Sequence, residues 1–319
     1  MTYNYELPES LIADRPPPKR GSSRMLVLER STGRITHTTF NDFPNFIQPG
    51  DLVVLNDSRV SPARIFSADK RVELLVLEQM PGFRWKCFVK PGRRVRLGTA
   101  IRLANTTARV IEILKEGERV FQLDAPVDLN VHGVLPLPPY IKRPVEPVDR
   151  ERYQTVFART PGSIAAPTAG LHFDSAILSQ IPHAFLTLHV GVGTFRPIKC
   201  ERIEDHVMHE ENYFLPPRTA DALNKCQRVI AVGTTVTRVL ESQPPKPFRS
   251  TSGSTRLFIR PPYQFQQVNQ LLTNFHLPKS TLLMLVCAFA GTEVVLAAYR
   301  EAIEKKYRFF SYGDCMLII

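Results

Sequence analysis

The fold is decided by a series of short segments between residues 65 and 123: VELLVLE (72–78), RWKCFVK (84–90), RVRLGTAIRL (94–103), ARVIEIL (108–114) and RVFQL (119–123). Each segment alternates apolar and polar residues, as strands with one buried face do. Turn signals separate the segments, namely Pro81-Gly82, Pro91-Gly92, Gly98 and Lys115-Glu116-Gly117. Regular short strands joined by such turns predict a small closed or nearly closed β-barrel.

The sequence on either side of these segments alternates strands with helices. A hairpin is expected at 24–29 and 35–40, strands at 51–55, 185–190, 228–232 and 257–260, helices at 219–227, 233–241, 281–289 and 292–306, and a flexible loop at 243–253. Ser280 and Thr292 are the expected caps of the last two helices. The sequence therefore predicts an α/β protein whose main mixed-sheet α/β domain (1–63 and 139–319) carries an inserted small closed β-barrel domain (64–138).

The charge balance favours a polyanionic partner. The 319 residues carry 41 basic and 30 acidic side chains, a formal charge of +11. Such an excess fits nucleic acid first and an anionic membrane surface second, and a merely basic soluble protein is the alternative. The N-terminal sequence lacks the apolar run of a signal peptide, and the cysteines show no CxxC pairing. We expect a cytoplasmic monomer with no membrane partner and no bound metal.

The stretch from Pro161 to Phe195 is almost uncharged, since only Asp174 carries a formal charge. It is rich in Gly, Thr, Ser, Pro and His, which offer close backbone approach, small hydroxyls and groups that titrate near neutrality. This composition predicts a ligand-facing site. Strand-to-helix turns are common anion sites, and Gly233-Thr234-Thr235 fits that geometry. Asn56-Asp57-Ser58 is a second such cluster, and on shape alone ordinary capping is the better explanation of both.

Other motifs leave alternatives open. His189 to Phe195 resembles the first motif of Rossmann-type methyltransferases but lacks its third glycine and its acidic residue. If residues 206–211 form a helix, His206 and His209 lie one turn apart. Three interpretations remain open: a metal site, an acid/base pair that involves Glu211, and a polar helix end at the surface. The spacing is not His-Glu-x-x-His, which argues against metal.

The segment from Arg84 to Arg109 is basic. It holds many Lys and Arg residues, no Asp or Glu, and the only tryptophan, Trp85. Phosphate contact or a solvated surface would each accommodate these cations. Asp314 and His276 lie in apolar or neutral surroundings, where a buried structural role is as well supported as catalysis.

Several blocks together identify a family resemblance. They are YELPESLIADRP, DLVVLNDSRVSPAR, LPLPPYI, ERYQTVFA, GSIAAPTAGLHF, LTLHVGVGTFRPI, HVMHEE, VIAVGTTVTRVLES, LLTNFHLPKSTLLMLVCAFAG and SYGDCMLI. From about Tyr5 to the C-terminus the chain resembles the S-adenosylmethionine:tRNA ribosyltransferase-isomerases of queuosine biosynthesis. The departures lie at the barrel entry, after HFDSAILSQ, and at Pro262 and Asn269.

The resemblance implies an activity. Such enzymes move the ribosyl part of S-adenosylmethionine onto 7-aminomethyl-7-deazaguanine (preQ1) at the wobble position of tRNA. The product is epoxyqueuosine-tRNA, and adenine and methionine are released. S-adenosylmethionine is thus consumed as a co-substrate, and no permanently bound cofactor is implied.

We expect the site residues to fall into three groups. Proton transfer is assigned to His172, His189, His209, Glu211 and Asp57. Substrate binding is assigned to Thr168, Gly170, Gly191, Gly193, Thr194, Thr234, Thr235, Asn274 and His276. Contacts to the anticodon stem-loop are assigned to Lys86, Lys90, Arg93, Arg94 and Arg59. The rival functions are a Rossmann-type tRNA methyltransferase, a non-catalytic tRNA-binding protein and a metal-dependent hydrolase.

Overall fold

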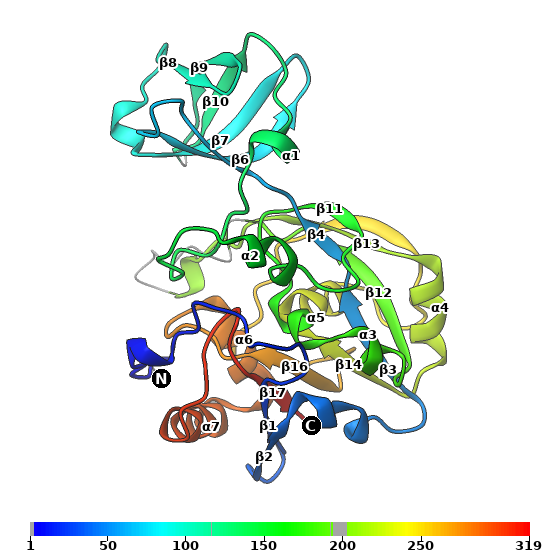
Figure 1. Cartoon of the computed structure of the whole chain (residues 1–319). Helices are drawn as coiled ribbons and strands as arrows, with labels where there is room; N and C mark the ends of the chain where they lie inside the picture. The colour runs from blue at the N-terminus through cyan, green and yellow to red at the C-terminus, as the bar shows by residue number, and fades with distance from the viewer. Residues whose placement is uncertain (1–2, 116, 192, 194–202) are drawn as a thin grey trace.

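A computed structural model describes residues 3–115, 117–191, 193 and 203–319 (Figure 1). A mixed nine-stranded sheet forms the body. Its strands run in the order β15 (Thr251–Thr255), β13 (Glu211–Leu215), β12 (His183–Leu188), β3 (Asp51–Asn56), β14 (Arg228–Val232), β16 (Gln270–Asn274), β17 (Cys315–Ile318), β1 (Arg24–Leu28) and β2 (Ile35–Thr39). The expected mixed-sheet α/β fold is confirmed.

The centre of this sheet is parallel, because β12, β3, β14 and β16 pair in the same direction. Every residue of β3 and β16 is buried. This burial explains the continuous apolar run of residues 52–55, since parallel strands are covered on both faces.

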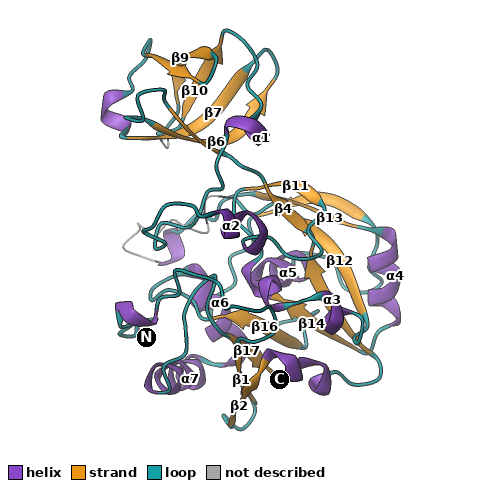
Figure 2. Ribbon diagram, viewed as in Figure 1, coloured by secondary structure: helices purple, strands orange, loops and turns teal. Residues whose placement is uncertain are grey.

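Helices and short turns cover the two faces (Figure 2). One face packs against α4 (Pro217–Lys225), α5 (Gly233–Glu241), α6 (Thr281–Ala290) and α7 (Thr292–Glu304). The other face packs against η2 (Phe40–Phe46), η4 (Thr168–His172) and α3 (Ser175–Leu178). Among the helices of the described residues, none is by itself long and apolar enough to cross a membrane; only α6 and α7 together pass that test, with a bend of 113° between them.

A second, six-stranded antiparallel sheet stands apart at the top of Figure 1. Its order is β5 (Arg64–Phe66), β6 (Glu73–Met80), β7 (Arg84–Lys90), β10 (Arg119–Leu123), β9 (Thr106–Ile113) and β8 (Ala100–Leu103). This sheet has its own hydrophobic cluster, which includes Leu74, Trp85 and Phe121. Trp85 is 3% exposed, so it serves this core and offers no stacking surface.

The expected closed barrel is not formed in the described residues. The end strands β5 and β8 share no ladder, and one backbone hydrogen bond, from Ala68 to Arg102 (2.9 Å), joins the neighbourhoods of the two strands. β5 and β8 each pair on one side only, with β6 and β9, so the six strands form an open sheet in the described residues.

Two further local expectations were wrong. Residues 257–260 form no strand; the strand is β15, Thr251–Thr255, which begins within the expected loop 243–253. β15 is polar, and it forms a strand because its backbone pairs with the edge of β13. Such backbone pairing cannot be recognised from the pattern of side chains. The last helix is preceded by Gly291, with φ 89°, and Thr292 does not cap it.

The two sheets are joined by short connections. β4 (Ser58–Val60) and β11 (Thr160–Ser163) form a parallel pair where the chain leaves the body. The chain returns through α1 (Leu129–His132) and α2 (Pro147–Arg152). Three 3-10 turns complete the described elements: η1 (Glu9–Leu11), η3 (Gly92–Arg94) and η6 (Ile203–Asp205).

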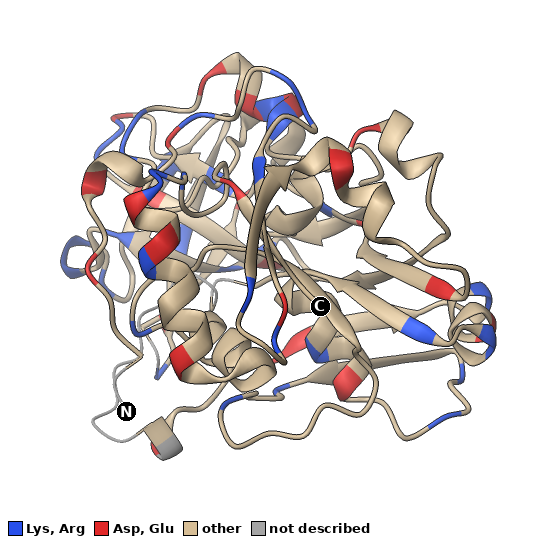
Figure 3. Cartoon of the chain, turned by 90° about the horizontal axis from the view of Figure 1, so that it is seen from below, with Lys and Arg blue, Asp and Glu red and all other residues tan. Residues whose placement is uncertain are grey.

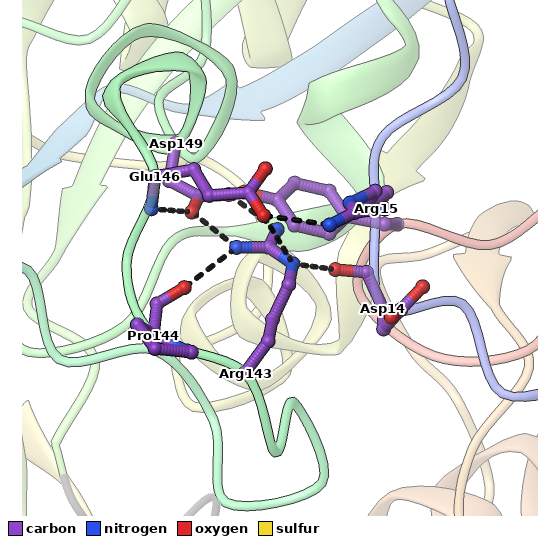
Figure 4. Close-up of polar contacts among 7 residues, drawn as sticks. Asp14, Arg15, Arg143, Pro144, Glu146 and Asp149 are labelled. Carbon is purple, nitrogen blue, oxygen red and sulfur yellow. Dashed lines mark hydrogen bonds and ion pairs between the residues drawn. The ribbon is translucent and has the colours of Figure 1, made fainter.

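A buried carboxylate fixes the returning segment (Figure 4). Asp149 is fully buried and accepts two hydrogen bonds from Arg143, at 2.7 and 2.8 Å. It also accepts from the backbone of Glu146 and from the Tyr312 hydroxyl, each at 2.8 Å. The network therefore ties α2 to the loop before the last strand.

Replacing Asp149 by Ala should lower the free energy of unfolding by about 3–5 kcal/mol, because the Arg143 guanidinium would be left without its buried partner. Urea denaturation measures the change. Arg15→Ala is the matched control, since Arg15 and Glu146 form an exposed pair at 2.7 Å whose loss should cost less than about 1 kcal/mol. Equal stabilities for Asp149→Ala and the wild type would contradict this account.

Candidate active site

A cavity opens at the carboxyl ends of β14 and β16. It encloses about 740 Å³, part of it open to solvent. Its lining includes Thr168 and Ala169 of η4, Gly233, Thr234 and Thr235 of α5, Asn274 at the end of β16, His276 after that strand, and Tyr140, Tyr153 and Ser311 from distant segments. No Asp, Glu, Lys or Arg appears among its described lining residues. Carboxyl ends of parallel strands are where α/β folds place ligands.

The first turn of α5 faces this cavity. Gly233 has φ 86°, which lets the chain turn sharply from β14 into the helix. No side chain of the described residues caps the helix. The N–H groups of this turn lack intrahelical acceptors, and the helix dipole adds partial positive charge. The expected strand-to-helix turn at Gly233-Thr234-Thr235 is confirmed, and it can bind a carboxylate. Asn56-Asp57-Ser58, by contrast, leads from β3 into β4 and precedes no helix.

His172 lies behind the cavity. Its Nδ1 is 2.9 Å from Ser23 Oγ, and its Nε2 is 3.3 Å from Asn274 Oδ1. Asn274 in turn donates to the Phe310 carbonyl at 2.8 Å. Burial lowers the pKa of His172 to about 4, so the ring is neutral near pH 7. His172 does not line the cavity itself but contacts Asn274, which does.

His276 is the one predicted imidazole that lines the cavity. Its Nε2 lies 2.8 Å from Thr273 Oγ1, and its backbone N–H donates to the Tyr299 hydroxyl at 3.0 Å. Burial lowers its pKa to about 3, so it presents a neutral ring.

A second polar cluster surrounds His189 on the other side of the strand end. The Thr187 hydroxyl donates to Asp57 Oδ1 at 2.6 Å, and Arg159 lies 3.3 Å from Asp57 Oδ2. Burial lowers the pKa of His189, and the negative charge of Asp57 opposes that shift. The structure thus brings His189 and Asp57 together, as neighbours whose charges interact.

Gly162 shapes the surroundings of the His189 ring. A Cβ at Gly162 would lie 2.9 Å from both Nδ1 and Cε1 of His189, and φ at this glycine is 135°. Nδ1 of His189 is buried without a hydrogen-bond partner among the residues described. Val190, the next residue, lines the cavity. The cavity and the His189 cluster are therefore back to back, one residue apart along the chain.

Glu211 is engaged in a buried ion pair. Its Oε1 accepts from the Gly191 N–H at 2.9 Å, and its Oε2 contacts the Arg238 guanidinium. The Glu211 and Arg238 side chains are 5% and 6% exposed, and Arg238 also donates to the Leu257 carbonyl at 3.0 Å. Both carboxylate oxygens are thus occupied, and Glu211 positions Gly191 at the end of the His189 segment.

His209 lies apart from the cavity, with its ring packed against Gly193. Residues 206–210 are not helical, because η6 ends at Asp205 and β13 begins at Glu211. His206 and His209 therefore do not share a helix face, and the part of the chain with described positions contains no group of three metal-binding side chains. Gly170 packs against Thr155 and Phe157. Thr194 is outside the described residues.

The sequence reasoning missed three hydroxyl groups of the cavity wall. Tyr140 and Ser311 are hydrogen-bonded to each other, and Tyr153 is fully buried beside them. Each lies in a block that carried the family resemblance: LPLPPYI, SYGDCMLI and ERYQTVFA. The family resemblance therefore pointed to these blocks. They are far apart in sequence, however, and only the fold brings their hydroxyl groups into one cavity.

Acidic residues from neighbouring segments partly balance the positive charge of the basic segment 84–109, which the sequence of that segment did not indicate. Strand pairing places Glu78 opposite Lys86 and Glu73 opposite Lys90, and Glu118 lies 3.9 Å from Lys86. Arg93 and Arg94 in η3 are exposed and make no ion pair with the described residues. Arg59 belongs to β4, away from this sheet. On the opposite side of the molecule, acidic and basic residues are interspersed (Figure 3).

Comparisons with known proteins confirm the resemblance. A family model described as "Queuosine biosynthesis protein" matches residues 1–318, and the chain belongs to this family. The S-adenosylmethionine:tRNA ribosyltransferase-isomerase of Syntrophus aciditrophicus is 47% identical and covers 99% of this chain, which spans 98% of the relative. The one from Carboxydothermus hydrogenoformans is 48% identical, with coverages of 99% and 98%. A crystal structure of S-adenosylmethionine tRNA ribosyltransferase from Thermotoga maritima is 36% identical, has a TM-score of 0.57, and covers 99% of each chain.

The buried His172 predicts a pH dependence of stability. Its folded pKa of about 4 lies below the ordinary value of about 6.5, so the unfolded chain binds the proton more tightly. Stability is fully present above about pH 6.5 and decreases as the pH falls toward 4. Between about pH 6.5 and 5 the wild type should lose about 2 kcal/mol more than His172→Asn. Urea denaturation across this range measures the difference; equal slopes would contradict a neutral buried ring.

Proposed function

Because the chain belongs to the queuosine biosynthesis protein family, we propose that it is an S-adenosylmethionine:tRNA ribosyltransferase-isomerase. The enzyme transfers and isomerises the ribosyl group of S-adenosylmethionine onto preQ1 at the wobble position of tRNA. Epoxyqueuosine-tRNA forms, and adenine and methionine leave. S-adenosylmethionine is the co-substrate, and the enzyme works as a cytoplasmic monomer. The observation that carries this proposal is the uncharged cavity that faces the first turn of α5 in a chain with full-length relatives of this name.

The lining of the cavity matches the parts of S-adenosylmethionine. The methionine carboxylate binds at the first turn of α5, beside Thr234 and Thr235. The sulfonium and the adenine lie among the aromatic rings of Tyr140, Phe275 and Phe310, since π faces attract cations and stack on bases. Thr168 and Asn274 are placed to bind ribose hydroxyls.

Proton transfer needs groups whose basicity suits neutral pH. The sulfonium acidifies the neighbouring C5′ protons, so a base must remove one, and the attacking amine must also lose a proton. We assign the second role to His189, which lies outside the cavity beside the carboxylate of Asp57, where the amine of the RNA base would approach. Glu211 holds Gly191 in place near His189, and His172 holds Asn274 in place at the cavity.

The tRNA approaches from the side of the six-stranded sheet. Arg93 and Arg94 are exposed cations of that sheet with no ion-pair partner among the described residues, so they are its best phosphate contacts. Lys86 and Lys90 contribute less, because glutamates face them across the strands. We treat residues 64–138 as the unit that grips the anticodon stem-loop while the body holds the reacting sugar.

Product analysis tests the function. Incubation of the protein with S-adenosylmethionine and tRNA bearing preQ1 should release free adenine and methionine and increase the mass of the RNA by that of the transferred sugar residue. Chromatography of the small molecules and mass analysis of the RNA measure both. S-adenosylhomocysteine as the product would indicate methylation instead, and unchanged S-adenosylmethionine would favour a non-catalytic tRNA-binding protein.

Gly162→Ala should reduce kcat about 100-fold and leave the affinity for S-adenosylmethionine nearly unchanged, because the new Cβ would displace the His189 ring from its position. Single-turnover kinetics and equilibrium binding separate the two effects. Gly33→Ala is the matched control, since Gly33 also has positive φ (75°) but no atom lies within 4 Å of its added Cβ. Equal losses in both variants would attribute the effect to backbone strain alone.

A further inference from the structure

A second cleft lies between the six-stranded sheet and the body. It encloses about 950 Å³ of space that opens to solvent. Its walls come from β4 and Pro161 on the body, α2 on the returning segment, Asn130 of α1, and Gly133 directly after α1. The cavity described above shares no lining residue with it among the described positions.

The charge of this cleft is entirely positive. Arg59 of β4 and Arg150 of α2 both line it, and none of its described lining residues is acidic. Both side chains are exposed, and neither makes an ion pair within the part of the chain that the structure describes. Two unpaired guanidinium groups in one concave site favour a bound anion, and Arg is suited to bidentate phosphate contact.

Apolar side chains are exposed on the elements that border the cleft. Val131 of α1 is 71% exposed, Val148 of α2 is 42% exposed, and Val156 beyond α2 is 43% exposed. Cationic groups with neighbouring apolar side chains match a nucleotide, which has a charged phosphate and an apolar sugar and base face.

The cleft is continuous with the His189 cluster. Arg59 is paired with Pro161 in the β4–β11 ladder, and Gly162, the next residue, contacts the His189 ring. Arg59 is also close in sequence to Asp57, the carboxylate beside His189. A phosphate held by Arg59 would therefore lie along the same strand pair that presents His189.

From this continuity we infer that the cleft binds a phosphodiester of the substrate RNA through Arg59 and Arg150, next to the nucleotide that reacts. The inference rests on the proposed function and adds a specific anchor to it. The anchor restrains the RNA backbone at the joint between the two sheets, so that the reacting base is presented to the Gly162–His189 surface.

Binding of an anticodon stem-loop RNA to Arg59→Ala, Arg150→Ala and the double variant tests the anchor. Each single variant should weaken binding about tenfold, and the slope of log affinity against log salt should become shallower by about 0.7 for each phosphate that the protein no longer neutralises. Arg59→Lys and Arg150→Lys keep the charge and should retain most of the salt slope. Arg300→Ala is the matched control, because Arg300 is an exposed cation on α7, far from the cleft (Figure 1).

The outcomes separate the inference from the function. Weaker binding with a shallower slope in the cleft variants, and wild-type behaviour of Arg300→Ala, supports the anchor. Wild-type affinity in the double variant, or weaker binding with an unchanged slope, overturns the anchor and leaves the proposed function standing. Binding of inorganic phosphate to the same variants is measured as well. Variants that lose phosphate binding but keep wild-type affinity for the RNA also overturn the anchor, since the cleft would then bind free anions and not the RNA backbone. A wild-type protein that neither binds the stem-loop nor transfers ribose overturns the function itself.

Discussion

The first turn of α5 is the constraint on which the site depends. The N–H groups of this turn face a cavity, and the described lining of that cavity carries no charged side chain. No side chain of the described residues caps the helix. Buried donors of this kind need an acceptor, and a substrate carboxylate provides one. The positive φ of Gly233 is what lets the buried strand β14 turn directly into the helix. In the proposed function, the position of the co-substrate follows from the geometry of this one strand-to-helix junction.

The residues of the proposed site are held by buried neighbours as well as by the cavity wall. Glu211 and Arg238 form a buried pair that fixes Gly191, and His172 orients Asn274 from behind. A buried pair of this type stabilises little in itself but is costly to break, so its value here is positional. Asp149 has the same function for the returning segment, because it binds Tyr312 next to Ser311 of the cavity wall.

The sequence predicted the parts of the fold and of the site that local pattern determines. The central strands and α5 follow from apolar runs and a glycine turn, whereas barrel closure depends on whether the end strands β5 and β8 meet each other, which no local pattern determines. The strand β15 was missed because its polar residues are ordered by a partner strand. Thr168, Thr234, Thr235, Asn274 and His276 do share one cavity, but sequence cannot tell an imidazole that lines a cavity from one that orients a neighbour, as His172 does. Tyr140, Tyr153 and Ser311 meet only because α2 and the last loop fold together.

The most direct test is a crystal structure of the protein with S-adenosylmethionine bound. The account predicts the methionine carboxylate within hydrogen-bond distance of the backbone N–H groups of Thr234 and Thr235. A carboxylate placed elsewhere, with the first turn of α5 left to solvent, would contradict it.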